Sequence, residues 1–181
     1  MDPSINNTST VLELSLEQYL AHLATTLTQK IDKLVVGAAI IHPHQSNPLS
    51  PRILLLKRSP TEIHYPNVFE MPGDNVEAKD LNIAREVEEE TGMKVTSIGK
   101  RLPDFQYFIE KSVVKDGKEE LVRKTCLQIS FCVSMDGADF RVNEKEHSEG
   151  VWASRETVEG LGDDGGYEEA CEVCAGCGFY G

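Results

Sequence analysis

Apolar residues are grouped in short runs along this 181-residue chain, and most of these runs predict β-strands. Residues 34–41 are almost entirely apolar, as in a strand that is covered on both faces of its sheet. Residues 52–58 repeat this pattern, and the Pro- and Ser-containing segment 42–51 predicts a connection across which the two strands could pair. Further strands are expected at residues 68–71, 95–98, 105–109 and 121–135.

Turn-forming residues and helical spacing account for other parts of the chain. Asp116-Gly117 lies between the last two predicted strands and is typical of a tight hairpin. Residues 16–27 repeat apolar side chains at helical spacing, after a capping box at residues 15–18. This helix is expected to cover the fold, with a homodimer contact as the alternative. A second, short helix is expected over residues 154–161.

The most acidic segment also follows helical spacing, over about residues 80–91, and Gly92 predicts its end. Glu86, Glu89 and Glu90 are spaced i, i+3 and i+4, so their carboxylates share one face of this helix. Like charges at this spacing repel each other, and a bound cation would remove the repulsion. Clustered carboxylates suit Mg²⁺ or Mn²⁺, which prefer oxygen ligands. The alternative is a solvated acidic face.

Residues 85–93 read Arg-Glu-Val-Glu-Glu-Glu-Thr-Gly-Met. They match the second half of the Nudix box at every fixed position, and Pro72-Gly73 looks like the turn that opens the box. The sequence therefore resembles the Nudix hydrolases, the MutT-like family. The resemblance implies an α/β fold, namely a Nudix-like α/β/α sandwich with a mixed β-sheet between helices.

The first half of the box departs from the family pattern. Counting forward from Pro72 puts the second glycine of the turn at Asp74, and Arg85 follows only 85 − 74 = 11 positions later, three fewer than in the family. Counting back from Arg85 puts the first glutamate of the box at Glu77, but the glycine position then falls on Met71. Either the loop is short and the helix begins late, or the box is damaged.

The resemblance implies a metal-dependent hydrolase that cleaves a pyrophosphate bond in a nucleoside diphosphate linked to another moiety. Such pyrophosphohydrolases act on acid anhydrides in phosphorus-containing substrates, so the expected partner is a small-molecule nucleoside diphosphate derivative. Glu86, Glu89 and Glu90 would bind Mg²⁺ or Mn²⁺. The catalytic residues would be Glu86, Glu89 and Arg85, the last by orienting a carboxylate. The alternative is a catalytically impaired Nudix-fold domain that binds a nucleotide or has a regulatory role.

Three residues are expected to bind substrate: Arg58, Phe69 and Gly73. Arg58 ends a predicted strand that lies near the substrate in the family, and an exposed charge at a strand end is the alternative. Phe69 could stack on a base or pack in the core. Gly73 belongs to the turn that opens the box.

Three further acids are candidates for the general base or for an extra metal ligand: Glu77, Glu146 and Glu149. The last two lie in residues 144–152, which resemble the late loop of the family, where an acid precedes a tryptophan. A solvent-exposed acidic loop is the alternative for each of them. His147 in this segment is interpreted as a phosphate contact or as an incidental loop histidine.

Composition limits the classes of function. A net charge of −12 argues against nucleic-acid binding, which requires a basic surface. No apolar run is long enough to span a bilayer and the N-terminus has no signal-peptide pattern, so a cytoplasmic protein without membrane contact is expected.

One domain is expected from the chain length. Residues 15–161 would form the Nudix hydrolase-like domain, between a flexible N-terminal tail at 1–14 and an irregular Gly- and Cys-rich tail at 162–181. The last tail departs from the family, and a zinc knuckle is the alternative to disorder there. Cys126 and Cys132 would lie on the same face of a strand and are expected to pack as small apolar side chains, with a disulfide as the alternative.

Overall fold

The computed structural model describes residues 18, 19, 21, 30–44, 47–76, 82–115 and 117–160. Seven strands and two helices are bounded within these residues. They are β1 (Lys33–His44), β2 (Asn47–Arg58), β3 (Phe69–Glu70), α3 (Ile83–Thr91), β4 (Val95–Arg101), β5 (Phe105–Lys115), β6 (Lys118–Met135), β7 (His147–Ala153) and α4 (Arg155–Gly160).

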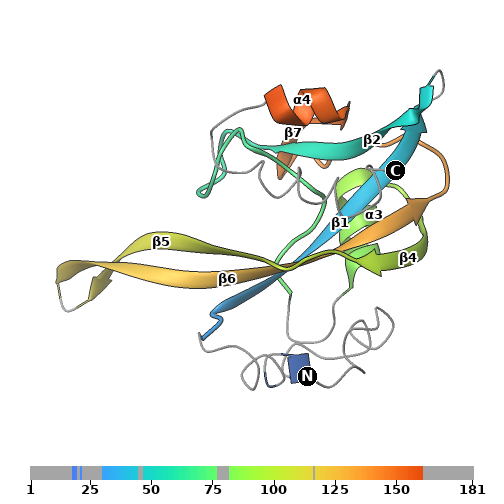
Figure 1. The fold of residues 1–181 in the computed structure, drawn as a ribbon. Helices are drawn as coiled ribbons and strands as arrows, with labels where there is room; N and C mark the ends of the chain where they lie inside the picture. The colour runs from blue at the N-terminus through green and yellow to red at the C-terminus, as the bar shows by residue number, and fades with distance from the viewer. Residues whose placement is uncertain are drawn as a thin grey trace.

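The strands form one mixed sheet with β1 in its middle (Figure 1). The order along the sheet is β3-β2-β1-β6-β4, while β5 pairs with β6 and β7 pairs with β2. β1 runs parallel to β6 and antiparallel to β2, which confirms the pairing that the first two apolar runs predict. The other pairings are antiparallel.

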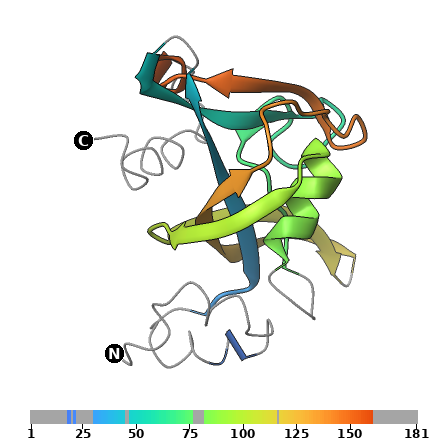
Figure 2. The ribbon, with the colours of Figure 1, turned by 90° about the vertical axis from the view of Figure 1, so that its right-hand side faces the viewer.

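The two helices lie on opposite sides of β2 (Figures 1 and 2), so the predicted α/β/α arrangement is confirmed. α3 packs on β1 and β4, and α4 packs on β7. On β1, Ala38 belongs to the apolar cluster that contains Ile83 of α3, whereas Ala39 belongs to the cluster that contains Val158 of α4. Since alternate residues of β1 are buried on opposite faces, its sequence is apolar throughout rather than alternating.

α3 begins at Ile83, and the expectation of a start near residue 80 was therefore wrong. The side chain of Asn82 accepts a hydrogen bond from the backbone N–H of Arg85 at 3.1 Å, which makes Asn82 the N-cap. At the other end Gly92 has a left-handed φ of 68° and donates its N–H to the carbonyl of Glu88, as the sequence predicts. The helix thus begins late, in agreement with the interpretation of a shortened loop.

Residues 72–76 lie along β1 and continue the sheet on the side that β2 leaves open. The N–H groups of Ala38 and Val36 donate to the carbonyls of Pro72 and Asp74, at 2.7 and 3.0 Å. Gly73 has a φ of 152°, and a Cβ at this position would lie 2.0 Å from the carbonyl oxygen of Val36. Asp74 is not among the described non-glycine residues with positive φ. The turn therefore requires glycine at position 73 and accepts aspartate at position 74.

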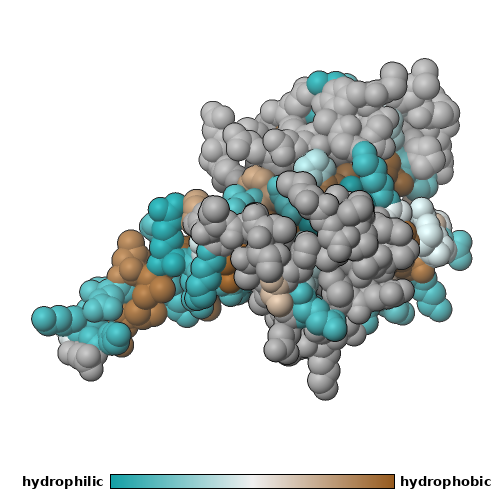
Figure 3. Space-filling view, turned by 60° about the horizontal axis from the view of Figure 1, so that its bottom comes forward, coloured by the Kyte–Doolittle hydropathy of each residue, from teal (hydrophilic) through white to brown (hydrophobic). Residues whose placement is uncertain are grey.

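The β5–β6 hairpin extends from the body of the molecule, and its turn contains Gly117 with a φ of 75°. Its register runs from the Phe105–Gln128 pair to the Lys115–Lys118 pair, which confirms the predicted tight hairpin. Figure 3 shows hydrophobic side chains between hydrophilic ones on this arm, where Val114 and Leu121 are exposed.

Several predictions concern residues outside the described ranges. Residues 18, 19 and 21 are helical, but the rest of the expected helix 16–27 and both predicted tails lie outside them. Cys126 is a free, buried thiol and Cys132 packs against the apolar cluster that contains Val158, as expected, so the two are not bonded to each other. Cys132 is nevertheless disulfide-bonded, which the sequence did not predict. Neither described helix has the length and hydropathy needed to cross a membrane.

Candidate active site

The segment expected to be a late loop is mostly a strand. Residues 147–153 form β7, which pairs with β2 from Ile53 to Arg58. The position of His147 opposite Arg58 follows a register shift in this pairing, and its side chain is only 3% exposed. The interpretation of His147 as an incidental loop residue was therefore wrong.

The carboxylates of α3 differ in burial and in partners. Glu90 is 3% exposed and its Oε2 accepts a hydrogen bond from the N–H of Gly73 at 2.9 Å. Glu86 is also buried, whereas Glu89 is exposed. Arg85 donates to the carboxylates of Glu86 and Glu89, the latter at 3.0 Å. Arg85 thus has the carboxylate contacts that the sequence led us to expect.

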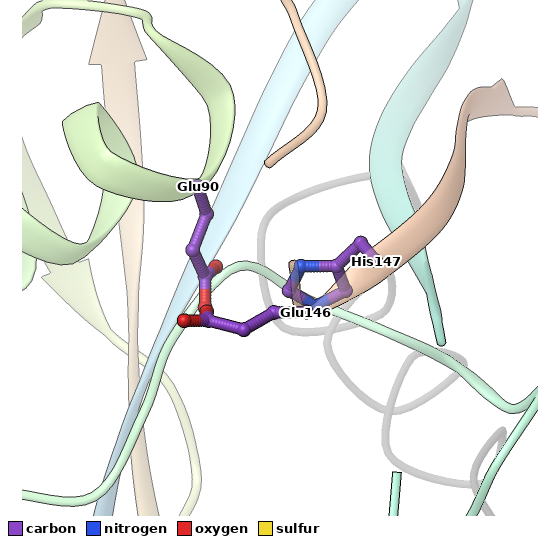
Figure 4. Close-up of side chains that lie close together, drawn as sticks. All are labelled: Glu90, Glu146 and His147. Carbon is purple, nitrogen blue, oxygen red and sulfur yellow. The ribbon is translucent and has the colours of Figure 1, made fainter. Parts of the chain in front are cut away.

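Glu90 meets two residues from the other end of the domain. Glu90, Glu146 and His147 each offer a ligand atom, and these three atoms lie within 4.8 Å of one another. We call this group the Glu90 cluster. In Figure 4 the carboxylate of Glu90 comes from α3 and meets that of Glu146, with the imidazole of His147 beside them. Among the described residues no other group of three metal-ligating side chains is this close, so the predicted trio of Glu86, Glu89 and Glu90 is not the tightest group.

Burial and neighbouring charges both disfavour ionisation in this region. Burial raises the pKa of Glu90 to about 9, against the Gly73 hydrogen bond, and the charges of Glu70, Glu146 and Glu86 raise it further. Burial also raises the pKa of Glu86, although Arg85 lowers it. A divalent cation would remove this penalty, and two carboxylates with an imidazole form a donor set that such a cation accepts. The residues therefore fit the metal that the family implies.

Charged side chains contact the Nε2 side of the His147 ring. Its Nε2 lies 3.1 Å from Oε1 of Glu70, which also accepts a hydrogen bond from Arg58 at 2.7 Å. Arg58 donates further hydrogen bonds to the carboxylate of Glu62 and to the carbonyl of His64, both at 3.0 Å. The other ring nitrogen of His147, Nδ1, is buried and has no hydrogen-bond partner among the described residues.

A cavity of about 460 Å³ adjoins the cluster, a volume in the range of small-molecule sites. All three residues of the Glu90 cluster contribute to its wall. The wall also includes four aromatic side chains: Tyr65, Phe69, Phe105 and Tyr107. A ligand in this cavity would therefore contact acidic groups at one part and flat apolar groups at another.

The cavity brings together several of the residues singled out in the sequence. Arg58, Phe69, Gly73, Glu90 and Glu146 line it. Four others are not among the described residues of its wall: Arg85, Glu86, Glu89 and Glu149. Glu149 instead forms a 3.7 Å ion pair with Lys57, and Glu77 lies outside the described residues.

Glu70 was not identified from the sequence, and His147 was considered as a phosphate contact but not as a metal-ligating residue. Glu70 stands in the apolar segment before the box and shows no spacing that marks it. For His147, the alternation along residues 147–153 does not tell which face is buried, because a bulge in the β2–β7 pairing sets the register.

Comparison with solved structures shows the same fold. The NUDIX domain of Shewanella oneidensis NrtR, complexed with ADP ribose, has a TM-score of 0.56 at 14% identity, covering 90% of this chain and 97% of that one. A MutT protein from Methanosarcina mazei Go1 has a TM-score of 0.53 at 24% identity, covering 81% and 94%. A C. elegans Ap4A hydrolase in a binary complex has a TM-score of 0.52 at 15% identity, covering 80% and 94%.

Comparison of sequences extends the likeness beyond the fold. No curated protein sequence matches the chain. A family model of the NUDIX domain matches residues 33–169, which is well over half of the chain and spans the strands, the acidic helix and the cavity described above. The chain belongs to the NUDIX domain family.

Proposed function

We propose that this protein is a metal-dependent hydrolase that cleaves the pyrophosphate bond of a nucleoside diphosphate linked to another moiety. The observation that supports this most strongly is the position of the Glu90 cluster in the wall of an aromatic-lined cavity. The cluster could bind a cation that contacts a diphosphate, and the aromatic side chains could stack on a nucleobase. One elongated ligand could therefore contact both parts of the cavity.

The residues of the chain have distinct parts in this proposal. Glu90 and Glu146 would hold Mg²⁺ or Mn²⁺, beside the acidic face of Glu86 and Glu89, to which Arg85 donates hydrogen bonds. The cation would neutralise charge on the diphosphate oxygens and would make water a better nucleophile. Water attacks one phosphorus, the P–O bond to the bridging oxygen breaks, and a carboxylate accepts the proton. Glu146 is exposed and next to Glu90, so it is the candidate for that base where its carboxylate does not bind the cation.

The remaining wall of the cavity is proposed to bind the substrate. Phe69 and Tyr65 offer ring faces on which a nucleobase could stack, and Gly73 contributes backbone to the cavity wall. Arg58 already forms ion pairs with Glu62 and Glu70. Its proposed role is therefore to stabilise the cavity wall as well as to bind phosphate.

Hydrolysis of a panel of nucleoside diphosphate derivatives, including ADP ribose, tests the proposal. The reaction is followed by chromatography of the nucleoside monophosphate product, because cleavage of the pyrophosphate bond in such compounds yields two phosphomonoesters and no free phosphate. The parent protein is expected to turn over at least one compound in the presence of Mg²⁺ or Mn²⁺. Glu90→Gln keeps the shape of the side chain but removes its charge, and we expect a loss of at least about 100-fold, in line with loss of a preorganised charged group.

Glu88→Gln is the matched control, because Glu88 is an exposed residue of the same helix and lies outside the cavity wall. This variant should keep the parent rate within about twofold, as substitutions at exposed positions usually do. Equal losses in the two variants would contradict the role given to Glu90.

A second candidate function is a Nudix-fold domain that binds a nucleotide without turnover. One observation favours it: the shortened first half of the box. The NUDIX domain of NrtR was solved in a complex with ADP ribose, so it is an example of a NUDIX domain that binds such a compound. Absence of turnover over the whole panel, with binding of one member retained, would decide for this second function.

A further inference from the structure

We infer that His147 is a metal ligand of this site, bound through Nδ1, so that the site combines a nitrogen donor with carboxylate oxygens. The inference rests on the proposed function, because the same cation would serve the hydrolysis. It deepens that proposal by stating the class of cation that the site prefers.

The first observation is the position of the imidazole. A ring nitrogen of His147 and the carboxylate oxygens of Glu90 and Glu146 lie within 4.8 Å of one another. Figure 4 shows the ring beside the two acids. Metal–ligand bonds are about 2.0 to 2.2 Å long, so atoms bound to one ion are themselves a few ångströms apart, as these are.

The second observation does not depend on the acids and concerns a ring nitrogen without a hydrogen-bond partner. His147 is 3% exposed, and its Nδ1 is buried without a hydrogen-bond partner among the described residues. A buried polar atom with no partner is costly, because it loses its hydrogen bond to water and gains none in return. A cation bound to the lone pair of Nδ1 would remove that cost.

The third observation concerns which nitrogen carries the proton. Oε1 of Glu70 lies 3.1 Å from Nε2, and because an ionised carboxylate can only accept a hydrogen bond, this contact favours the tautomer with hydrogen on Nε2. The lone pair then stays on Nδ1. Metal-binding histidines commonly donate their other N–H to a carboxylate in this way, which orients the ring and makes the ligating nitrogen more basic. Arg58 in turn holds Glu70 at 2.7 Å.

A nitrogen ligand changes the order of cation preference. Mg²⁺ is best served by oxygen ligands and water, whereas imidazole raises the affinity for Mn²⁺ and more strongly for the later transition ions. The site should therefore bind Mn²⁺ more tightly than Mg²⁺. Loss of His147 should reduce Mn²⁺ affinity more than Mg²⁺ affinity.

Pulsed electron paramagnetic resonance of Mn²⁺ bound to the full-length protein tests the inference without any substrate. The parent should show coupling of the manganese to one nitrogen, and His147→Asn should lose this coupling with a fall in Mn²⁺ affinity of about tenfold or more. His64→Asn is the matched control. His64 lies in the same cavity wall but outside the Glu90 cluster, so its variant should keep both the coupling and the affinity.

Glu70→Gln covers the case in which His147→Asn does not fold. This variant leaves the ligand in place but weakens the group that orients it, so nitrogen coupling should persist while Mn²⁺ affinity falls, by about tenfold. Unchanged Mn²⁺ affinity in Glu70→Gln would overturn the inference. Absence of nitrogen coupling in the parent, or its persistence in His147→Asn, would overturn it as well.

The outcomes separate this inference from the proposed function. Manganese bound through His147 in a protein that turns over no diphosphate would leave the inference standing and remove the hydrolase proposal. Turnover in a protein whose bound manganese has oxygen ligands alone would do the reverse.

Discussion

At the scale of single residues, the most consequential group is the carboxyl of Glu90. It is buried at 3% exposure, it accepts one hydrogen bond from the N–H of Gly73, and it faces the acid of Glu146. A carboxylate in such a place is costly to ionise without a cation. The residue therefore links the pH dependence of stability to metal binding.

The metal-free protein should become less stable as the pH rises. Glu90 has an ordinary pKa of 4.5 in the unfolded chain and a pKa of about 9 in the folded one, so between these values the folded state holds more protons. Its stabilising contribution is complete below about pH 4.5 and is lost as the pH approaches 9. In a chelating buffer, the melting temperature should fall across this window in the parent and in Glu88→Gln.

Glu90→Gln should show a smaller fall, since the amide does not titrate, and the raised pKa of Glu86 leaves a residual slope. Added Mn²⁺ should restore stability to the parent at high pH by binding the folded state. Identical pH profiles for the parent and Glu90→Gln would contradict the assignment of the buried charge.

Gly73 is the second residue whose replacement should have a large effect. A Cβ at this position would meet the carbonyl oxygen of Val36 at 2.0 Å, and the φ of 152° disfavours any other residue. Gly73→Ala should lose at least about 2 kcal/mol more of unfolding free energy than Gly117→Ala, which has a left-handed φ but nothing within 4 Å. Denaturant unfolding measures both, and equal losses would contradict the close approach of residues 72–76 to β1.

At the scale of elements, α3 is short and depends on its ends. It spans only Ile83–Thr91, and Asn82 and Gly92 cap it. Apolar packing through Ile83 and Val87 holds it against the sheet. Because the helix places Glu86, Glu89 and Glu90, its N-cap contributes to the site as well as to stability.

Asn82→Ala should lower the unfolding free energy by about 1 kcal/mol, because the N–H of Arg85 loses its side-chain acceptor. Asn82→Asp should retain most of the stability, since aspartate is an equally good N-cap. Denaturant unfolding of both variants checks this. Equal destabilisation by alanine and aspartate would mean that the cap is not the stabilising contact.

The elements also show how far the sequence could predict this site. Helical spacing and the stop at Gly92 identified α3, and the apolar runs identified β1 and β2, because these signals are local. The start of the helix was misplaced because Asp80 and Asn82 are both residues that favour an N-cap, and the sequence alone does not choose between them. β7 was taken for a loop, because its pairing with β2 depends on residues that are nearly a hundred positions away in the chain.

At the scale of the whole molecule, the site is assembled from distant parts of the chain. β3 contributes Glu70, the turn along β1 contributes Gly73, α3 contributes Glu90, and the start of β7 contributes His147. The fold and the acidic helix followed from the resemblance in one contiguous motif. The partners of Glu90 did not, because only the tertiary fold brings residues 146 and 147 to residue 90.

The net charge of −12 belongs to the same scale. An acidic chain repels an anionic substrate at long range, so a nucleoside diphosphate must be drawn in by local groups. The cavity wall contains Lys33 and Arg58 as such groups, but Arg58 is already paired with two carboxylates. A divalent cation on the Glu90 cluster would supply the positive charge that the wall lacks.

Calorimetric titration of the metal-free protein with Mn²⁺ at about pH 7, repeated in buffers of different ionisation enthalpy, tests the central claim most directly. Since the pKa of Glu90 lies near 9, the carboxyl is protonated before the cation binds and must lose its proton on binding. We expect the parent to release about one proton per bound ion and Glu90→Gln to bind more weakly with almost no release. Failure of the parent to bind Mn²⁺, or binding with no release of protons, would contradict the account.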